Sequence, residues 1–90
     1  MRRIELDGRR MDTRAAAWAY LRQELSLPEY FGNNLDALAD CLGEMGRVSI
    51  TLRYAVSMVN ALGSFGLALL EVFENAASKR TDMVFRTQNR

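Results

Sequence analysis

The alternation of strand-like and helix-like segments along the chain constrains the fold more than any other feature. Residues 3–6 alternate polar and apolar side chains, residues 48–54 alternate and are rich in β-branched residues, and residues 82–87 form a third strand-like stretch. Helical segments lie between successive stretches. Strands joined through helices run parallel, with right-handed crossovers. We therefore expect an α/β fold in which a three-stranded parallel sheet is packed with about four helices.

Capping residues and a proline set the limits of the first helix and of the loop after it. Asp12 or Thr13 can cap this helix, and Trp18 is expected in its buried face. Pro28 disfavours a helical conformation of the residue before it, so we expect a loop over residues 27–32.

Two more helices are expected between the second and third strands. The first covers about residues 56–62 and ends at Gly63, because glycine readily adopts the left-handed conformation that ends helices. Ser64 is expected to cap the long helix that follows it.

The size and composition of the chain predict a single domain, residues 1–90, that stays in water. Apolar residues make up 49% and charged residues 26%, which is typical of globular proteins, and 90 residues are too few for a catalytic cleft between two lobes. No apolar stretch approaches the roughly 20 residues that span a bilayer, and no secretory apolar run follows the N-terminus. We expect a cytoplasmic protein with no membrane partner.

Two features of the composition argue against an enzyme. The chain has no histidine, so Ser-His, Cys-His and histidine-based zinc sites cannot form. Cys41 is the only cysteine, and its place on an apolar helix face favours a packed thiol over a nucleophile. We therefore assign no catalytic residue, and we expect neither a cofactor nor a metal.

A net charge of +1 hides an uneven distribution of charge. The segment from Gln23 to Gly46 has no lysine or arginine, whereas the rest of the chain carries all 12 of them and only 6 of the 11 acids. The five acids of the segment are Glu24, Glu29, Asp36, Asp40 and Glu44. An acidic segment within a basic surround points to association with a charged partner.

The helix that Asn34 is expected to cap concentrates this charge on one face. A helical wheel with about 100° between residues places Leu35, Leu38, Cys41, Leu42 and Met45 on one side. Asp36, Asp40 and Glu44 lie on the other side. Asp36 gains roughly 0.3–1 kcal/mol from the helix dipole, but each like-charged pair one turn apart costs a few tenths of a kcal/mol. Solvated helix faces are commonly charged, so this row alone does not establish a binding surface.

The residues before this helix strengthen the case for an interface. Tyr30 and Phe31 stand next to Gly32, Asn33 and Asn34, at the start of the acidic face. Aromatic side chains beside charges often anchor protein interfaces. We expect Phe31 to be buried in the core and Tyr30 to be exposed.

An exposed carboxylate row beside an aromatic ring imitates a phosphate backbone beside a base. It should therefore fit a basic groove that evolved for nucleic acid, which predicts a nucleic-acid-processing enzyme as the partner. Direct binding of nucleic acid is not expected, because it would depend on scattered arginines without interleaved aromatics. These arginines are Arg2, Arg3, Arg9, Arg10 and Arg14.

Residues 27–42, LPEYFGNNLDALADCL, resemble the signature of the barstar family of ribonuclease inhibitors. The similarity extends more loosely over nearly the full chain and implies the same three-stranded parallel sheet. It also implies that the loop and the helix after it block the active site of a small secreted guanyl-specific ribonuclease.

The resemblance assigns roles to individual residues. By motif position, Asp40 corresponds to the aspartate that fills the phosphate pocket of the nuclease, Tyr30 should lie against its catalytic groups, and Asp36 should pair with its cationic groups. Three positions depart from the family: Ala39 and Met45 replace aromatic residues, and Asn75 replaces an acid. The resulting partner-binding set is Tyr30, Gly32, Asn33, Asn34, Asp36, Ala39, Asp40, Glu44 and Asn75.

Three functional hypotheses follow. The first is a monomeric cytoplasmic immunity protein of a toxin–antitoxin kind, which binds and occludes a basic ribonuclease or a related toxin nuclease. The second is a regulatory protein-interaction module without a nuclease target. The third is a metal-dependent hydrolase in which Asp36, Asp40 and Glu44 bind Mg²⁺ or Ca²⁺.

Overall fold

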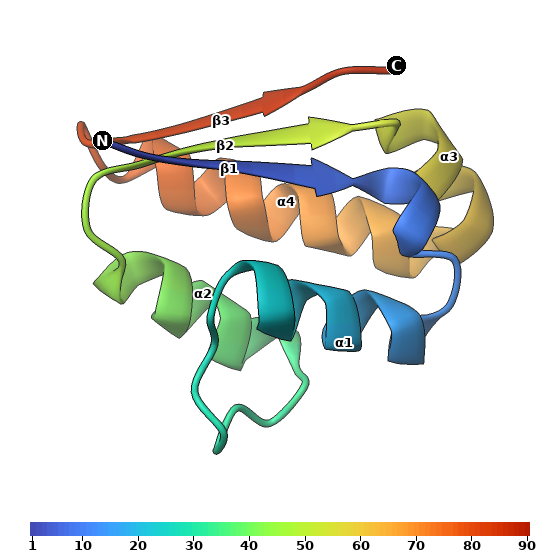
Figure 1. Ribbon diagram of the computed structural model, residues 1–90, viewed down its shortest axis with the longest axis horizontal. Coiled ribbons are helices and arrows are strands. Elements are labelled where there is room, and N and C mark those ends of the chain that lie inside the picture. Colours follow the sequence, from blue (N-terminus) through green and yellow to red (C-terminus); the bar gives the residue numbers. More distant parts are fainter.

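The computed structural model describes residues 1–90, and its strands form one parallel sheet (Figure 1). The strands are β1 (Arg2–Asp7), β2 (Val48–Arg53) and β3 (Met83–Thr87), in the spatial order β1-β2-β3. Arg2 pairs with Val48, and Val48 pairs with Met83, so the three strands start level with one another. The predicted α/β fold with a three-stranded parallel sheet is confirmed.

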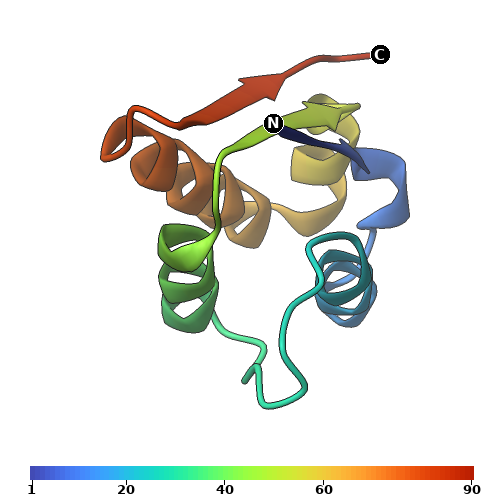
Figure 2. The ribbon, with the colours of Figure 1, turned by 60° about the vertical axis from the view of Figure 1, so that its left-hand side comes forward.

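Four α-helices and one short 3₁₀ helix connect the strands. They are η1 (Gly8–Arg10), α1 (Arg14–Glu24), α2 (Leu35–Glu44), α3 (Ala55–Leu62) and α4 (Ser64–Ser78). The four helices that the sequence predicts are all present. Figure 2 shows the sheet along one side of the molecule, with α1, α2 and α4 below one face and with η1 and α3 at the ends of β1 and β2.

The core lies between the sheet and the helices. In β2, Val48, Ile50 and Leu52 are buried, as the alternation predicts, because they point from the central strand toward the helices. The other face of the sheet has no helix on it (Figure 2), and its side chains are polar or charged apart from Val84 of β3. The largest fully buried side chains include Leu6, Leu21, Leu38, Leu42, Met58 and Leu69. Burial of a side chain of this size stabilises the fold by roughly 1.5–3 kcal/mol.

Two of the predicted helix ends are found in the structure, and a third is not. The Thr13 hydroxyl accepts a hydrogen bond from Ala16 N, and Gly63 ends α3 with a φ of 61°. The prediction that Ser64 caps α4 is wrong, because Ser64 is already the first residue of that helix. Only Gly63 separates α3 from α4, so this one residue caps both helices and contributes no side-chain hydrogen bond.

The start of η1 is packed too closely for any side chain. A Cβ atom at Gly8 would lie 2.2 Å from the Tyr54 carbonyl oxygen and 3.0 Å from that of Arg53. Both of these atoms belong to the backbone, which cannot move aside without disturbing the end of β2.

The variant Gly8→Ala should therefore lose about 1–3 kcal/mol of the free energy of unfolding, measured by urea denaturation. Gly43→Ala is the matched control, since nothing lies within 4 Å of a Cβ at this helical position. This control should gain up to about 1 kcal/mol from helix propensity. Equal stability of the two variants would contradict the close packing at Gly8.

Candidate functional site

Helix α2 places its three acids in water. Leu38 and Leu42 are fully buried, whereas Asp36, Asp40 and Glu44 are exposed on the opposite side. The three ion pairs of the protein join Arg9 to Asp7, Arg53 to Glu5, and Arg80 to Asp82. The α2 carboxylates are therefore exposed and have no ion-pair partner within the chain.

The free backbone groups at the two ends of α2 form hydrogen bonds with different kinds of partner. At the N-terminus, Asn34 Oδ1 accepts a hydrogen bond of 2.7 Å from Ala37 N, as the cap prediction requires. At the C-terminus, the guanidinium of Arg80 donates to Leu42 O at 2.7 Å and to Gly46 O at 3.0 Å. Hydrogen bonds from a cation to these carbonyls offset the unfavourable position of Glu44 near the negative end of the helix.

Arg80 also forms a hydrogen bond of 2.8 Å with Asp82, and its side chain is only 15% exposed. This hydrogen bond lowers the pKa of Asp82 below its ordinary value. The role of Arg80 could not be predicted from the sequence, because Arg80 contacts a helix end 38 residues earlier in the chain. No local pattern signals such a contact.

Cys41 behaves as the packed thiol that the sequence predicts. It is half-buried on the inner side of α2. Burial, together with the negative charges of Glu44 and Asp40, raises the pKa of the thiol. A thiol with a raised pKa is a weak nucleophile at neutral pH.

The loop before α2 has one aromatic ring inside and one outside, as expected. Phe31 is 5% exposed, and its ring centroid lies 5.5 Å from that of Trp18. Tyr30 is 88% exposed. Asn33 adopts a left-handed backbone conformation with a φ of 52°, which turns the chain into the helix cap at Asn34. The loop therefore presents Tyr30 beside the start of the acidic face.

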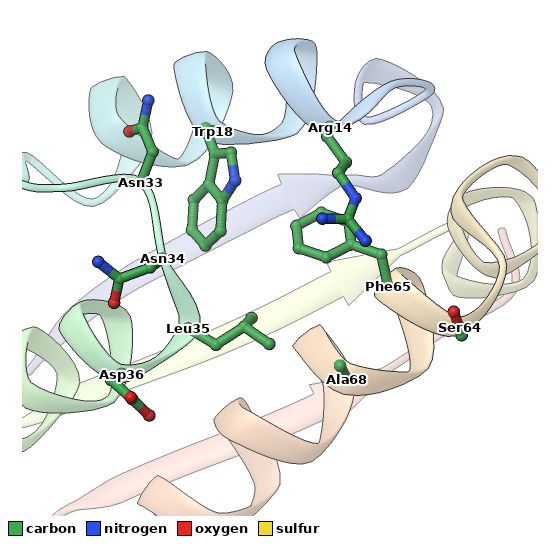
Figure 3. A pocket seen from close by; sticks show the side chains of 9 residues that line it. All are labelled: Arg14, Trp18, Asn33, Asn34, Leu35, Asp36, Ser64, Phe65 and Ala68. Atoms are coloured by element: carbon green, nitrogen blue, oxygen red, sulfur yellow. The ribbon is translucent and has the colours of Figure 1, made fainter.

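A hollow of about 550 Å³ lies between the N-terminal ends of α2 and α4 and the side of α1 (Figure 3). The guanidinium of Arg14 lies 4.5 Å from the centroid of the Phe65 ring, at one end of the hollow. Three of the lining residues, Asn33, Asn34 and Asp36, belong to the predicted partner-binding set. The other lining residues come from α1, α2 and α4. They are Arg14, Trp18, Leu35, Ser64, Phe65 and Ala68.

The remaining candidates are also at the surface. Gly32 and Ala39 are exposed, and Ala39 adjoins Asp40 on α2. Asn75 is exposed on α4, and helical periodicity places it on the same side as Ser64 and Ala68, which border α2 at the hollow. The fold thus brings the face of α4 that carries Asn75 beside the acidic helix, although the two segments are distant in sequence.

No helix has the length and apolar character that a membrane crossing requires. No group of three or more Cys, Asp or Glu side chains lies close enough together to bind a metal ion.

Comparison with known proteins identifies the family. A family model described as "Barstar (barnase inhibitor)" matches residues 1–88. The chain belongs to the barstar family. A relative from Bacillus subtilis (strain 168), named "Putative ribonuclease inhibitor YrdF", is 35% identical over 86 residues. The alignment covers 91% of this chain and 92% of the relative. The resemblance predicted from residues 27–42 is confirmed, and this barstar-family chain is similar to inhibitors rather than to enzymes.

Loss of the Arg80 side chain should destabilise the protein through the end of α2. Arg80→Met removes the charged donor from the carbonyls of Leu42 and Gly46, and leaves Leu42 O only the 3.4 Å hydrogen bond from Met45 N. It should reduce the free energy of unfolding by about 1.5–3 kcal/mol in urea denaturation. Lys79→Met removes the same charge from the neighbouring exposed residue and should change stability by less than about 0.5 kcal/mol. Similar losses in both variants would argue against a specific contact of Arg80 with α2.

Proposed function

We propose that this barstar-family protein is an intracellular inhibitor that binds the active site of a basic ribonuclease or a related toxin nuclease. The binding surface consists of the loop at residues 29–34 and the exposed face of α2. The observation that carries this proposal is the exposed row Asp36, Asp40 and Glu44, which has no ion-pair partner in its own chain. The family match and the name of the B. subtilis relative support the same conclusion.

Each part of the surface contributes a different interaction. Asp40 stands at the middle of the row, one turn from each of the other two acids, and fills the position that a substrate phosphate occupies in the nuclease. Asp36 pairs with neighbouring cations of the nuclease. Tyr30, 88% exposed at the tip of the loop, lies against its catalytic groups and supplies apolar contact area.

The row also affects the rate of encounter. Carboxylates that are already exposed and unpaired create a negative potential in front of the binding surface before contact. A basic nuclease is attracted along this potential, so association is fast at low ionic strength and slows as salt screens the charges. For an inhibitor that must act before the nuclease cleaves cellular RNA, a fast association is a functional advantage.

Replacement of Asp40 by alanine should weaken binding strongly while the fold survives. We expect a loss of about 2–5 kcal/mol in the free energy of binding to barnase, a range that derives in part from the barnase–barstar complex itself. Binding is measured by titration calorimetry and by inhibition of RNA cleavage, and circular dichroism checks the fold. Asp12→Asn, which removes an exposed acid outside α2, should bind like the wild type. Full inhibition by Asp40→Ala would refute the role of Asp40.

Ionic strength should act mainly on the association rate. Between about 50 and 500 mM salt, we expect the association rate constant with barnase to fall at least roughly tenfold, with a smaller change in the dissociation rate. Stopped-flow fluorescence measures both rates. An association rate that does not depend on salt would show that the acidic row does not steer the partner.

A further inference from the structure

Arg22 of α1 holds the proposed binding loop through three hydrogen bonds. Its Nη1 donates to Phe31 O at 3.3 Å and to Asn33 Oδ1 at 3.2 Å, and its Nη2 donates to Glu29 O at 3.3 Å. The carbonyl oxygen of Arg22 also accepts a hydrogen bond of 3.0 Å from Leu27 N. One residue of α1 thus contacts both the start and the centre of the loop.

The acceptors of Arg22 surround the most exposed part of the loop. The carbonyls of Glu29 and Phe31 belong to the residues on either side of Tyr30. Asn33, whose amide oxygen is the third acceptor, has the left-handed conformation that leads the chain into α2. Phe31 fixes the loop from inside by its contact with Trp18, and Arg22 fixes its polar groups from the side of α1.

We propose that Arg22 is a positioning residue, which holds residues 29–33 in their binding conformation before the partner arrives. With respect to binding, this inference rests on the proposed function. An ordered loop loses less conformational entropy on association than a mobile one, so the fixed loop favours tight binding.

The geometry explains why this residue is an arginine. A planar guanidinium carries donors on separate nitrogens, so it reaches acceptors on both sides of Tyr30 at once. The ammonium group of a lysine is a single point of donation and cannot span the same set. Arg22 is also the last basic residue before the acidic segment. Nothing in the sequence alone distinguishes its role from that of the other arginines.

Electrostatic steering and positioning predict opposite effects when the Arg22 charge is removed. Loss of a positive charge makes the protein more negative, which by itself speeds association with a basic nuclease. Loss of the positioning contacts weakens binding. A fall in affinity in Arg22→Met therefore cannot come from the change in net charge.

The first experiment tests the loop in the free protein, by amide hydrogen exchange followed by NMR. In Arg22→Met and Arg22→Lys, the Phe31 amide, which donates to Pro28 O, should exchange roughly tenfold faster than in the wild type. The Leu27 amide is an internal control, because its acceptor is the backbone carbonyl of Arg22, which both variants keep. Unchanged exchange at Phe31 in both variants would overturn the proposal.

The second experiment measures binding to barnase. We expect Arg22→Met to bind roughly tenfold more weakly, with Arg22→Lys between it and the wild type. Arg86→Met is the matched control, since Arg86 is exposed in β3 and its loss changes the net charge equally. It should bind at least as tightly as the wild type. If Arg22→Met binds as tightly as Arg86→Met, Arg22 has no positioning role.

The two experiments separate failure of this inference from failure of the proposed function. Absence of binding by the wild type, to barnase and to other small basic ribonucleases, would refute the proposed function, whereas the exchange of Phe31 would still decide whether Arg22 orders the loop. Circular dichroism and urea denaturation confirm that each variant is folded. If Arg22→Met does not fold, Arg22→Lys provides both measurements.

Discussion

The binding surface depends on the way α2 is fixed in the structure. Leu38 and Leu42 bury one side of the helix completely, Asn34 caps its first turn, and Arg80 binds the carbonyls at its last turn. Because the inner side is buried and both ends are hydrogen-bonded, the outer side can carry three like charges. The cost of their mutual repulsion, a few tenths of a kcal/mol per pair, is small beside the burial of even one leucine.

None of the arginines forms an ion pair with this outer side. Arg9 and Arg53 pair with acids at the end of β1 and lie over the Tyr54 ring, and Arg10 and Arg14 lie over aromatic rings near α1. Arg80 pairs with Asp82. These cations are held by groups elsewhere in the structure, so the net charge of +1 coexists with an acidic surface that has no ion pairs.

Residues whose roles follow from local patterns could be predicted from the sequence. Four such features depend only on neighbours within a few residues. They are the buried residues of β2, the two faces of α2, the cap at Asn34, and the opposite positions of Phe31 and Tyr30. Because such neighbours are visible as periodicity, capping chemistry or turn residues, these predictions are confirmed.

The features that the sequence did not reveal depend on contacts between distant segments. Arg80 caps a helix 38 residues away, and Arg22 binds a loop that folds back on α1. The hollow of Figure 3 forms only when three helices pack together. The cap expected at Ser64 failed for a related reason, since the single residue Gly63 must end one helix and begin the next.

The two open edges of the sheet have a consequence for behaviour at high concentration. With the order β1-β2-β3, both outer strands present unpaired backbone groups along their edges. Each edge is only five or six residues long and carries arginines, namely Arg2 and Arg3 on β1 and Arg86 on β3. Short, charged edges oppose the addition of a strand from another molecule, so the sheet resists growth into fibrils although one of its faces is bare.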